Sequence, residues 1–277
     1  MWQRGATMSY LYYSDLYSDG ISPEARFPRL RYRLTREELI KRGALNEEDF
    51  LTPNSVNLED LQLVHDAGYV ARFLSGTLSS QEIRRIGLRP WTEAIIERTC
   101  ILTGAAVMAV HDVCNQLAFY AGNLAGGTHH AHRDYGSGYC VFNDIAVGAA
   151  VAMRDYGLER IAVLDLDVHQ GDGTATIFQD DPRVFTLSIH CQQNFPFRKQ
   201  MSDLDIGVDE GMGDEAYLNL LRETLPAVLD RAKPELVFFQ AGVDPLKADR
   251  LGRLTLSREG LQARNRYVFD LLDDAQL

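Results

Sequence analysis

The chain has 277 residues, of which 45% are hydrophobic and 24% charged, so it is long enough to bury a sizeable core and has an ordinary globular composition. Its formal net charge of −11 and its lack of long Lys or Arg runs argue against direct nucleic-acid binding through phosphates. An acidic body can attract cationic ligands such as lysine-rich tails or polyamines, but solubility alone explains the charge at least as well.

The N-terminus carries no apolar region of the kind found in secretory signals. Met8 is a second candidate start, which makes residues 1–8 a possible N-terminal extension. The four cysteines have neither CxxC spacing nor the density of a disulfide framework, and no apolar run has the length needed to cross a bilayer. We therefore expect a cytoplasmic protein with no membrane partner.

The first ninety residues are less regular than the rest. Tyr10–Tyr13 is a candidate first strand, and Thr35–Arg42 has a helical pattern. His65 lies in the segment Leu58–Ser75, and a histidine in such a place packs or caps more often than it binds a ligand.

From about residue 92 onward, helical patterns alternate with short apolar runs. The expected elements are a helix Thr92–Tyr120 with Thr92 as its N-cap, a short strand breaking into a glycine-rich turn over Gly122–Gly127, a helix Asp144–Tyr156, strands Arg160–Val168 and Arg183–His190, a helix Asp214–Arg231, a strand Glu235–Ala241, and a helix Ser257–Asp274 capped by Ser257.

This alternation predicts the α/β class, with a mainly parallel sheet covered by helices on both faces in a three-layer α/β/α arrangement. In such sheets, functional sites form beyond the C-terminal ends of the strands. There is no repeat, low-complexity tract or clear linker, so we expect residues 1–277 to form a single domain.

The most informative stretch is the apolar run Val163–His169, which contains Asp165, Asp167 and His169 at intervals of two residues. In a β-strand, residues at this spacing point to one face. Burying such groups is costly unless they are paired or hold a metal. The segment therefore predicts a metal-binding strand end.

Two further clusters follow predicted strands. His129 and His130 lie on a glycine-rich loop that allows both to reach a cavity, although a solvated loop with incidental histidines is the alternative. Asp244 directly follows an apolar strand, where a lone Asp is usually a helix cap or turn former. As a third ligand it would leave one coordination position open, which is the catalytic arrangement of zinc.

Together these motifs resemble the histone deacetylase and acetoin-utilisation family, which has the arginase–deacetylase fold. Four separated motifs occur in the family's order over nearly the whole chain, and Asn194–Lys199 with Gln200–Leu204 further resembles the class IV branch and its bacterial relatives. The resemblance implies hydrolysis of an acylated lysine in a peptide or protein, or of a small acylated amine, with Zn²⁺ or, as a second candidate, Fe²⁺.

The resemblance also implies residue roles. Asp167, His169 and Asp244 match the metal ligands, so Asp165 is not expected to bind the catalytic metal. A structural K⁺ site is implied at Asp165, Asp167, the His169 backbone, Ser188 and the Ile189 backbone.

The histidine pair matches the family's catalytic pair, with His130 as the general acid/base and His129 as an electrostatic helper. Asp165 and Asp172 match the carboxylates that hydrogen-bond to His129 and His130, respectively. The substrate channel, which encloses the aliphatic stem of the acylated lysine, is implied to include Gly138, Tyr139, Phe195 and Leu251.

One family element is missing from the pattern. The family uses a tyrosine hydroxyl on a Gly-Gly-Gly-Tyr loop after one more buried strand, whereas this chain ends at Leu277. Tyr267 lies within the preceding helical pattern. We therefore expect a C-terminally truncated domain that lacks the last strand and helix, and a weak deacetylase, because losing one oxyanion donor typically costs about 10²–10³ in rate.

Two alternatives to a deacylase stay open. A non-catalytic acyl-lysine or acyl-amine binder would keep the metal without turnover. An arginase-type dimetal ureohydrolase shares the fold but needs a second carboxylate-rich motif, and around Asp244 there is only Gly-Val-Asp-Pro-Leu. Substrate, acyl length and oligomeric state do not follow from the sequence.

Overall fold

A computed structural model describes residues 9–277, so the possible extension at residues 1–8 lies outside the described residues. The chain divides after Gly157 into two compact units, which are described separately. The single domain expected from the sequence stays a prediction.

The first unit contains a three-stranded parallel sheet in the order β2-β1-β3. Strand β1 (Ser9–Tyr12) pairs with β2 (Phe50–Leu51) on one side and with β3 (Tyr120–Asn123) on the other, with Tyr10 opposite Ala121. The candidate strand at Tyr10–Tyr13 is thus confirmed. The helices that precede β3 are α1 (Leu16–Asp19), α2 (Arg31–Lys41), the 3₁₀ helix η1 (Glu47–Asp49), α3 (Leu58–Gln62), α4 (Ala67–Leu74), α5 (Ser80–Ile86) and α6 (Ala94–Cys114).

The long helix α6 forms the centre of this unit, where it packs against β3 and against α7 (Asp144–Tyr156). Within residues 9–277 it is the one helix that is long and apolar enough to cross a membrane, contrary to the sequence-based expectation that none would be. Its buried residues include Arg98, Thr99 and Thr103 as well as apolar side chains, as is typical of a core helix. The length and composition of α6 therefore do not indicate a membrane span.

Helix α6 also differs from its predicted bounds. It begins after Glu93 rather than Thr92, and no side chain caps it. It ends at Cys114 because Gln116 adopts a positive φ of 59° and turns the chain, so Tyr120 joins β3 instead of the helix.

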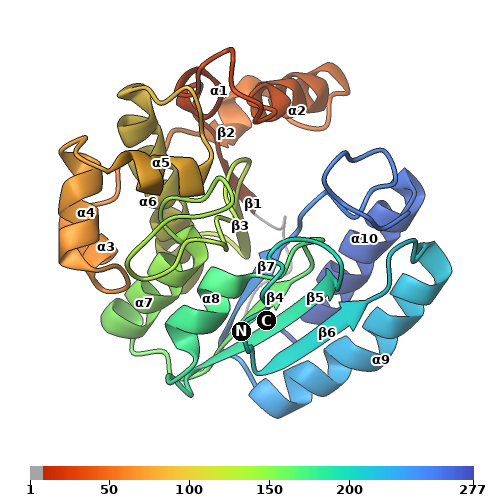
Figure 1. Cartoon of the computed structure of the whole chain (residues 1–277). Coiled ribbons are helices and arrows are strands. Elements are labelled where there is room, and N and C mark those ends of the chain that lie inside the picture. The colour runs from red at the N-terminus through yellow and green to blue at the C-terminus, as the bar shows by residue number, and fades with distance from the viewer. Residues whose placement is uncertain (1–8) are drawn as a thin grey trace. The chain divides into compact units, whose positions relative to one another are not determined.

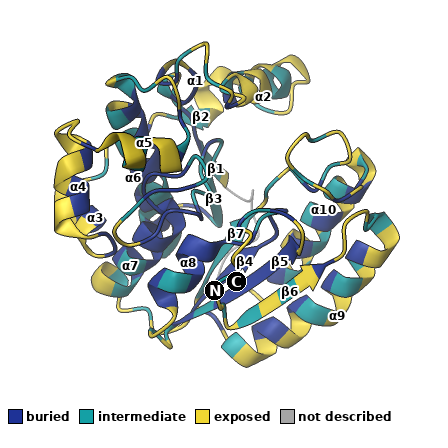
Figure 2. Ribbon diagram, in the orientation of Figure 1, coloured by how far each residue is buried: buried dark blue, intermediate teal, exposed yellow. Residues whose placement is uncertain are grey.

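The second unit contains a four-stranded parallel sheet in the order β6-β5-β4-β7 (Figure 1). Its strands are β4 (Ile161–Asp165), β5 (Val184–Cys191), β6 (Leu204–Val208) and β7 (Leu236–Gln240). Asp165, the last residue of β4, lies opposite Ser188 of β5 and Gln240 of β7. All five residues of β4 are buried (Figure 2), as expected of a central parallel strand.

Helices α9 (Asp214–Ala232) and α10 (Arg258–Asp274) pack on one face of this sheet, and the short helix α8 (Asp172–Phe178) follows β4. The core on that face combines alternate residues of the β4 segment with apolar residues of both helices. It includes Leu164, Leu166, Val168, Leu187, Ile189, Tyr217, Leu221, Leu225, Val268 and Leu272.

Strand β4 is shorter than the predicted strand Arg160–Val168. The N–H of Asp167 donates to Asp165 Oδ1 at 3.1 Å, and the N–H of His169 donates to Asp167 Oδ1 at 2.9 Å. These side chains accept from the two N–H groups in place of a neighbouring strand, so Asp167 and His169 lie in the loop beyond β4, although the Leu166 N–H still donates to the Gln240 carbonyl at 3.1 Å.

Most other expected elements are confirmed, including the helix Asp144–Tyr156 at its predicted bounds and the strands β5 and β7 within one residue at each end. Helix α2 begins four residues before the predicted Thr35. Since all strand pairings within both sheets are parallel and helices flank them, the predicted α/β class is confirmed.

The start of α10 is held by a polar contact with the start of α9. Ser257 Oγ accepts from the Gly260 N–H at 2.9 Å and donates to Asp214 Oδ2 at 2.5 Å.

Substituting Ser257→Ala should lower the free energy of unfolding by about 1–2 kcal/mol, because the helix loses its N-cap and Asp214 loses a donor. Urea denaturation measures this; the exposed Ser80→Ala serves as the control and should stay within about 0.5 kcal/mol of the parent.

Candidate metal centre

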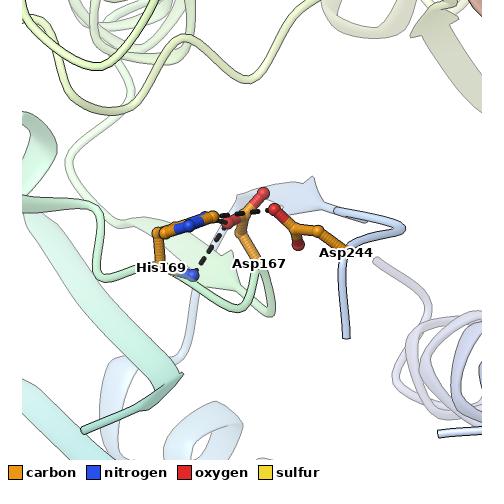
Figure 3. A group of neighbouring side chains, drawn as sticks. All are labelled: Asp167, His169 and Asp244. Atoms are coloured by element: carbon orange, nitrogen blue, oxygen red, sulfur yellow. Dashed lines mark hydrogen bonds and ion pairs between the residues drawn. The ribbon is translucent and has the colours of Figure 1, made fainter. Parts of the chain in front are cut away.

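Three potential metal ligands meet where β4 and β7 end. Asp167 and His169 follow β4, and Asp244 follows the neighbouring strand β7. His169 Nδ1 lies 2.9 Å from Asp167 Oδ1 and 3.1 Å from Asp244 Oδ2, and one ligand atom from each residue lies within 4.8 Å of the others. Figure 3 shows the three side chains directed toward one another. The structure therefore brings these predicted ligands together.

The alternation predicted for the strand continues into the loop. Leu166 and Val168 point into the core beneath α9 and α10, which leaves Asp167 and His169 on the opposite side. In addition, the N–H of Val168 donates to Asp244 Oδ1 at 3.0 Å. One oxygen of Asp244 thus fixes the loop after β4, while the other faces His169.

The loop after β7 approaches Asp167 so closely that only glycine fits at position 242. A Cβ added to Gly242 would collide with Oδ2 of Asp167 and would lie 2.8 Å from its Cα. The glycine is therefore part of the geometry that brings Asp244 to the other two ligands.

Electrostatics at this cluster favour a cation. Burial lowers the pKa of His169, but the hydrogen bonds and charges of Asp167 and Asp244 outweigh it and raise the pKa to about 10. Burial and the charge of Asp167 raise the pKa of Asp244 to about 6. The buried carboxylate of Asp167, the half-buried carboxylate of Asp244 and one imidazole nitrogen form a donor set that suits a divalent transition metal with an open coordination position.

Asn194 is a neighbour of the cluster whose role the sequence pattern did not reveal. It is buried, and its Nδ2 donates to the Leu251 carbonyl at 2.6 Å while its Oδ1 accepts from the Arg253 N–H at 3.1 Å. The same Nδ2 lies 3.4 Å from His169 Nε2. Asn194 therefore holds the segment around Leu251 beside the His169 ring.

Of the residues expected at the K⁺ site, Asp165, Ser188 and Ile189 come from the two central strands of the same sheet, and Asp167 and His169 follow β4. Asp165 of β4 lies opposite Ser188 of β5, and both are buried. Ser188 Oγ is 3.0 Å from His190 Nδ1, and Ile189 between them is fully buried. The K⁺ assignment itself stays a prediction.

The histidine pair lies in the first unit on a loop held by Asp144. His129 and His130 are buried, with ring centroids 4.1 Å apart. Asp144, the first residue of α7, accepts from the Gly127 N–H at 3.0 Å, and from the N–H and hydroxyl of Thr128 at 2.7 and 2.6 Å. Asp144 was not singled out from the sequence, and its only signal there is its place at a helix start.

The remaining predicted site residues are placed as follows. In the first unit, Gly138 and Tyr139 have positive φ values of 52° and 68°, and the Tyr139 N–H donates to the Ile86 carbonyl at 2.7 Å. In the second, Asp172 is buried at the start of α8, Phe195 is half-buried, and Leu251 is 53% exposed. Their catalytic and channel roles stay predictions.

His65 has the packing role that the sequence favoured. It is buried, its Nδ1 lies 3.0 Å from the His132 carbonyl, and its Nε2 accepts from the Asn143 N–H at 2.9 Å. Burial lowers its pKa to about 4, so it is neutral near pH 7 and braces the loop that follows the histidine pair.

Comparison with known proteins shows to which family this chain is similar. The family model of the histone deacetylase domain matches residues 25–276. An uncharacterized protein of Picosynechococcus sp. (strain ATCC 27264 / PCC 7002 / PR-6) is 44% identical over 261 residues, which is 93% of this chain and 85% of the relative. The acetoin utilization protein AcuC of Staphylococcus aureus (strain MSSA476) is 27% identical over 99% of this chain and 75% of its own.

Two further matches extend this result. Histone deacetylase 2 of Arabidopsis thaliana is 29% identical over 83% of this chain and 61% of its own length. The crystal structure of the HDA15 HD domain matches with a TM-score of 0.82 at 20% identity, covering 95% of this chain and 80% of that one. At this identity the structural likeness shows the fold alone, and it confirms the predicted arginase–deacetylase-like architecture.

The close approach at Gly242 predicts a specific loss of metal binding. Gly242→Ala should weaken Zn²⁺ binding by about 10–100-fold while the chain stays folded, because the added methyl group displaces the Asp167 carboxylate. Competition with a chromophoric chelator measures the affinity. Gly213→Ala, where an added Cβ meets only Thr255 Oγ1 at 3.7 Å, should bind like the parent; equal affinity for both variants would contradict the prediction.

The raised pKa of His169, about 10, predicts proton release on metal binding. At pH 8 the metal-free histidine is protonated, so binding of Zn²⁺ should release about one proton, and affinity should rise about tenfold per pH unit between pH 7 and 9. Asp244, with a pKa of about 6, is already ionised in this range. Calorimetry in buffers of different ionisation enthalpy measures the number of protons released. His111→Asn in the other unit is the control and should release as many protons as the parent. A Zn²⁺ affinity that does not change with pH would contradict the prediction.

Proposed function

Because this chain belongs to the histone deacetylase domain family, it is a hydrolase of the deacetylase type, and we propose that it is a zinc-dependent deacylase. Its proposed substrates carry an acetyl or longer acyl group in amide linkage to a lysine side chain or to a small amine. The observation that carries the proposal is the convergence of Asp167, His169 and Asp244, which provide the ligands of a three-ligand catalytic metal. Fe²⁺ is the second candidate metal.

When bound, the metal would polarise the acyl carbonyl and lower the pKa of a water molecule toward about 7. The chain's own residues then move the protons. His130 accepts a proton from the attacking water and delivers it to the leaving amine nitrogen, and His129 stabilises the charge that develops. We assign to Asp165 and Asp172 the role of orienting the two imidazoles and fixing their tautomers, as the resemblance to the family implies.

The local geometry of the first unit supports this assignment of the histidine pair. Asp144 fixes the loop through three hydrogen bonds just before His129, so the backbone position of the pair is set before substrate binds. A Cβ at Gly126, whose φ is 152°, would lie 2.7 Å from Asp144 Oδ2, so this loop also depends on a glycine.

Substrate recognition is proposed to use Gly138, Tyr139, Phe195 and Leu251 as walls around the aliphatic stem of the acylated residue. Aromatic faces pack against methylene groups and exclude water from the reacting amide. The net charge of −11 favours cationic peptides or polyamines as substrates. The proposal also includes a structural K⁺ held by Asp165, Asp167, the His169 backbone, Ser188 and the Ile189 backbone. It further includes membership of class IV and a cytoplasmic setting.

A turnover assay on the zinc-loaded chain tests the proposal. We expect hydrolysis of at least one member of a panel of acetyl-lysine peptides, longer acyl-lysine peptides and acetylated polyamines. Asp244→Asn should lower kcat/KM by at least about 100-fold, because a ligand to the metal is lost. Asp230→Asn, which changes an exposed carboxylate on α9, should keep the parent rate.

The two ways of failing are distinct. Stoichiometric zinc without turnover on any substrate would replace the deacylase with a non-catalytic acyl-amine binder. Failure to bind zinc would remove the metal site itself.

A further inference from the structure

Arg264, in the middle of α10, is a fully buried charged side chain to which the sequence assigned no role. Arginine is almost never fully buried unless it is paired, since removing its charge from water is costly. The groups whose charge acts on Arg264 include the carboxylates of Asp167 and Asp244. The contacts of Arg264 therefore indicate why its burial is tolerated.

One nitrogen of the guanidinium joins the two loops that carry the metal ligands. Arg264 Nη1 donates to the Leu166 carbonyl at 3.1 Å and to the Gly242 carbonyl at 2.8 Å. Leu166 directly precedes Asp167, and Gly242 lies two residues before Asp244. The hydrogen bonds thus fix the backbone of both loops next to their ligand residues.

The charge of Arg264 also acts on the cluster. Burial lowers the pKa of Arg264, while Tyr217, Asp167 and Asp244 act to raise it. A guanidinium stays charged in proteins, so it places a fixed positive charge near two carboxylates that must both be ionised to bind a metal.

Helix α10 presents Arg264 from a rigid position. Val268 and Leu272, one and two turns further on, are buried in the core beneath β4, and the contact of Ser257 with Asp214 fixes the helix start. The Arg264 guanidinium carbon lies 5.9 Å from the centre of the Phe239 ring of β7. The side chain is thus restrained along its length.

We propose that Arg264 is a positioning residue of the metal centre, which holds the loops of Asp167 and Asp244 at the spacing that a metal requires. It acts through these loops and touches neither metal nor substrate. The inference rests on the proposed metal-dependent function. It also explains why arginine is used, since the two N–H groups of its planar Nη1 point to two carbonyls at once in a fixed geometry.

Zinc affinity of the folded chain tests the proposal. We expect Arg264→Met to weaken Zn²⁺ binding by about 10–100-fold, and Arg264→Lys to weaken it less, because lysine keeps the charge but not the planar geometry. The matched control is Arg266→Met on the exposed side of the same helix, which should bind like the parent. The absorption spectrum of the Co²⁺-loaded protein gives a second readout, and it should change in both Arg264 variants because the ligand spacing changes.

A purely structural role would give a different pattern. The melting temperature of the metal-free variants would then fall, but zinc affinity and the cobalt spectrum of the folded protein would match the parent, and the inference would be wrong. Arg264→Lys, which keeps the buried charge, provides the answer if Arg264→Met does not fold. A parent chain that binds no zinc would instead overturn the proposed function, so the two failures are distinguishable.

Discussion

The hydrogen bond from the Val168 N–H to Asp244 Oδ1 couples two loops that are far apart in sequence. It brings a second carboxylate to within 3.1 Å of a histidine that already contacts Asp167. The buried carboxylate of Asp167 and the half-buried one of Asp244 repel each other at this spacing, so a nearby cation stabilises the arrangement. The protonated His169, whose pKa is raised, and the buried guanidinium of Arg264 both offset this repulsion with positive charge. A divalent metal would offset it more fully, because it would bring two positive charges to the point where the three ligands meet.

The parallel sheet of the second unit makes this arrangement possible. Because β4 and β7 are neighbours that run in the same direction, the loops that follow them leave the sheet at one edge. Every second residue of the β4 segment packs in the core beneath α9 and α10, so the residues between them point to the opposite side of the sheet. Core packing and candidate metal binding therefore depend on alternate residues of one segment.

Much of the candidate site followed from local pattern. The two-residue spacing of Asp165, Asp167 and His169 indicated a metal-binding strand end, and the position after a strand made Asp244 a candidate third ligand. The choice of Asp167 and His169 over Asp165 came from the resemblance to the family. The bounds of β4 were not predictable in the same way, because side-chain oxygens take the place of its last ladder partners. Asn194 and Arg264 were missed for another reason, since the partners that tie them to the site lie 22 to 98 residues away along the chain and no periodicity encodes such contacts. The end of α6 was also missed, because Gln116 carries no obvious turn signal.

The hydrogen bonds that cap the ligand loop have a consequence for metal selectivity. Asp167 and Asp244 each commit one oxygen to a backbone N–H, so neither is free to shift toward a larger ion. Ligands held in this way lose little conformational entropy when they coordinate, but they also adapt poorly. Ca²⁺ needs six to eight oxygen ligands and Mg²⁺ a nearly ideal octahedron, and a rigid set of two oxygens and one nitrogen satisfies neither. A metal bound by these residues would therefore be selected by the stiffness of the loop as well as by the chemistry of its donors.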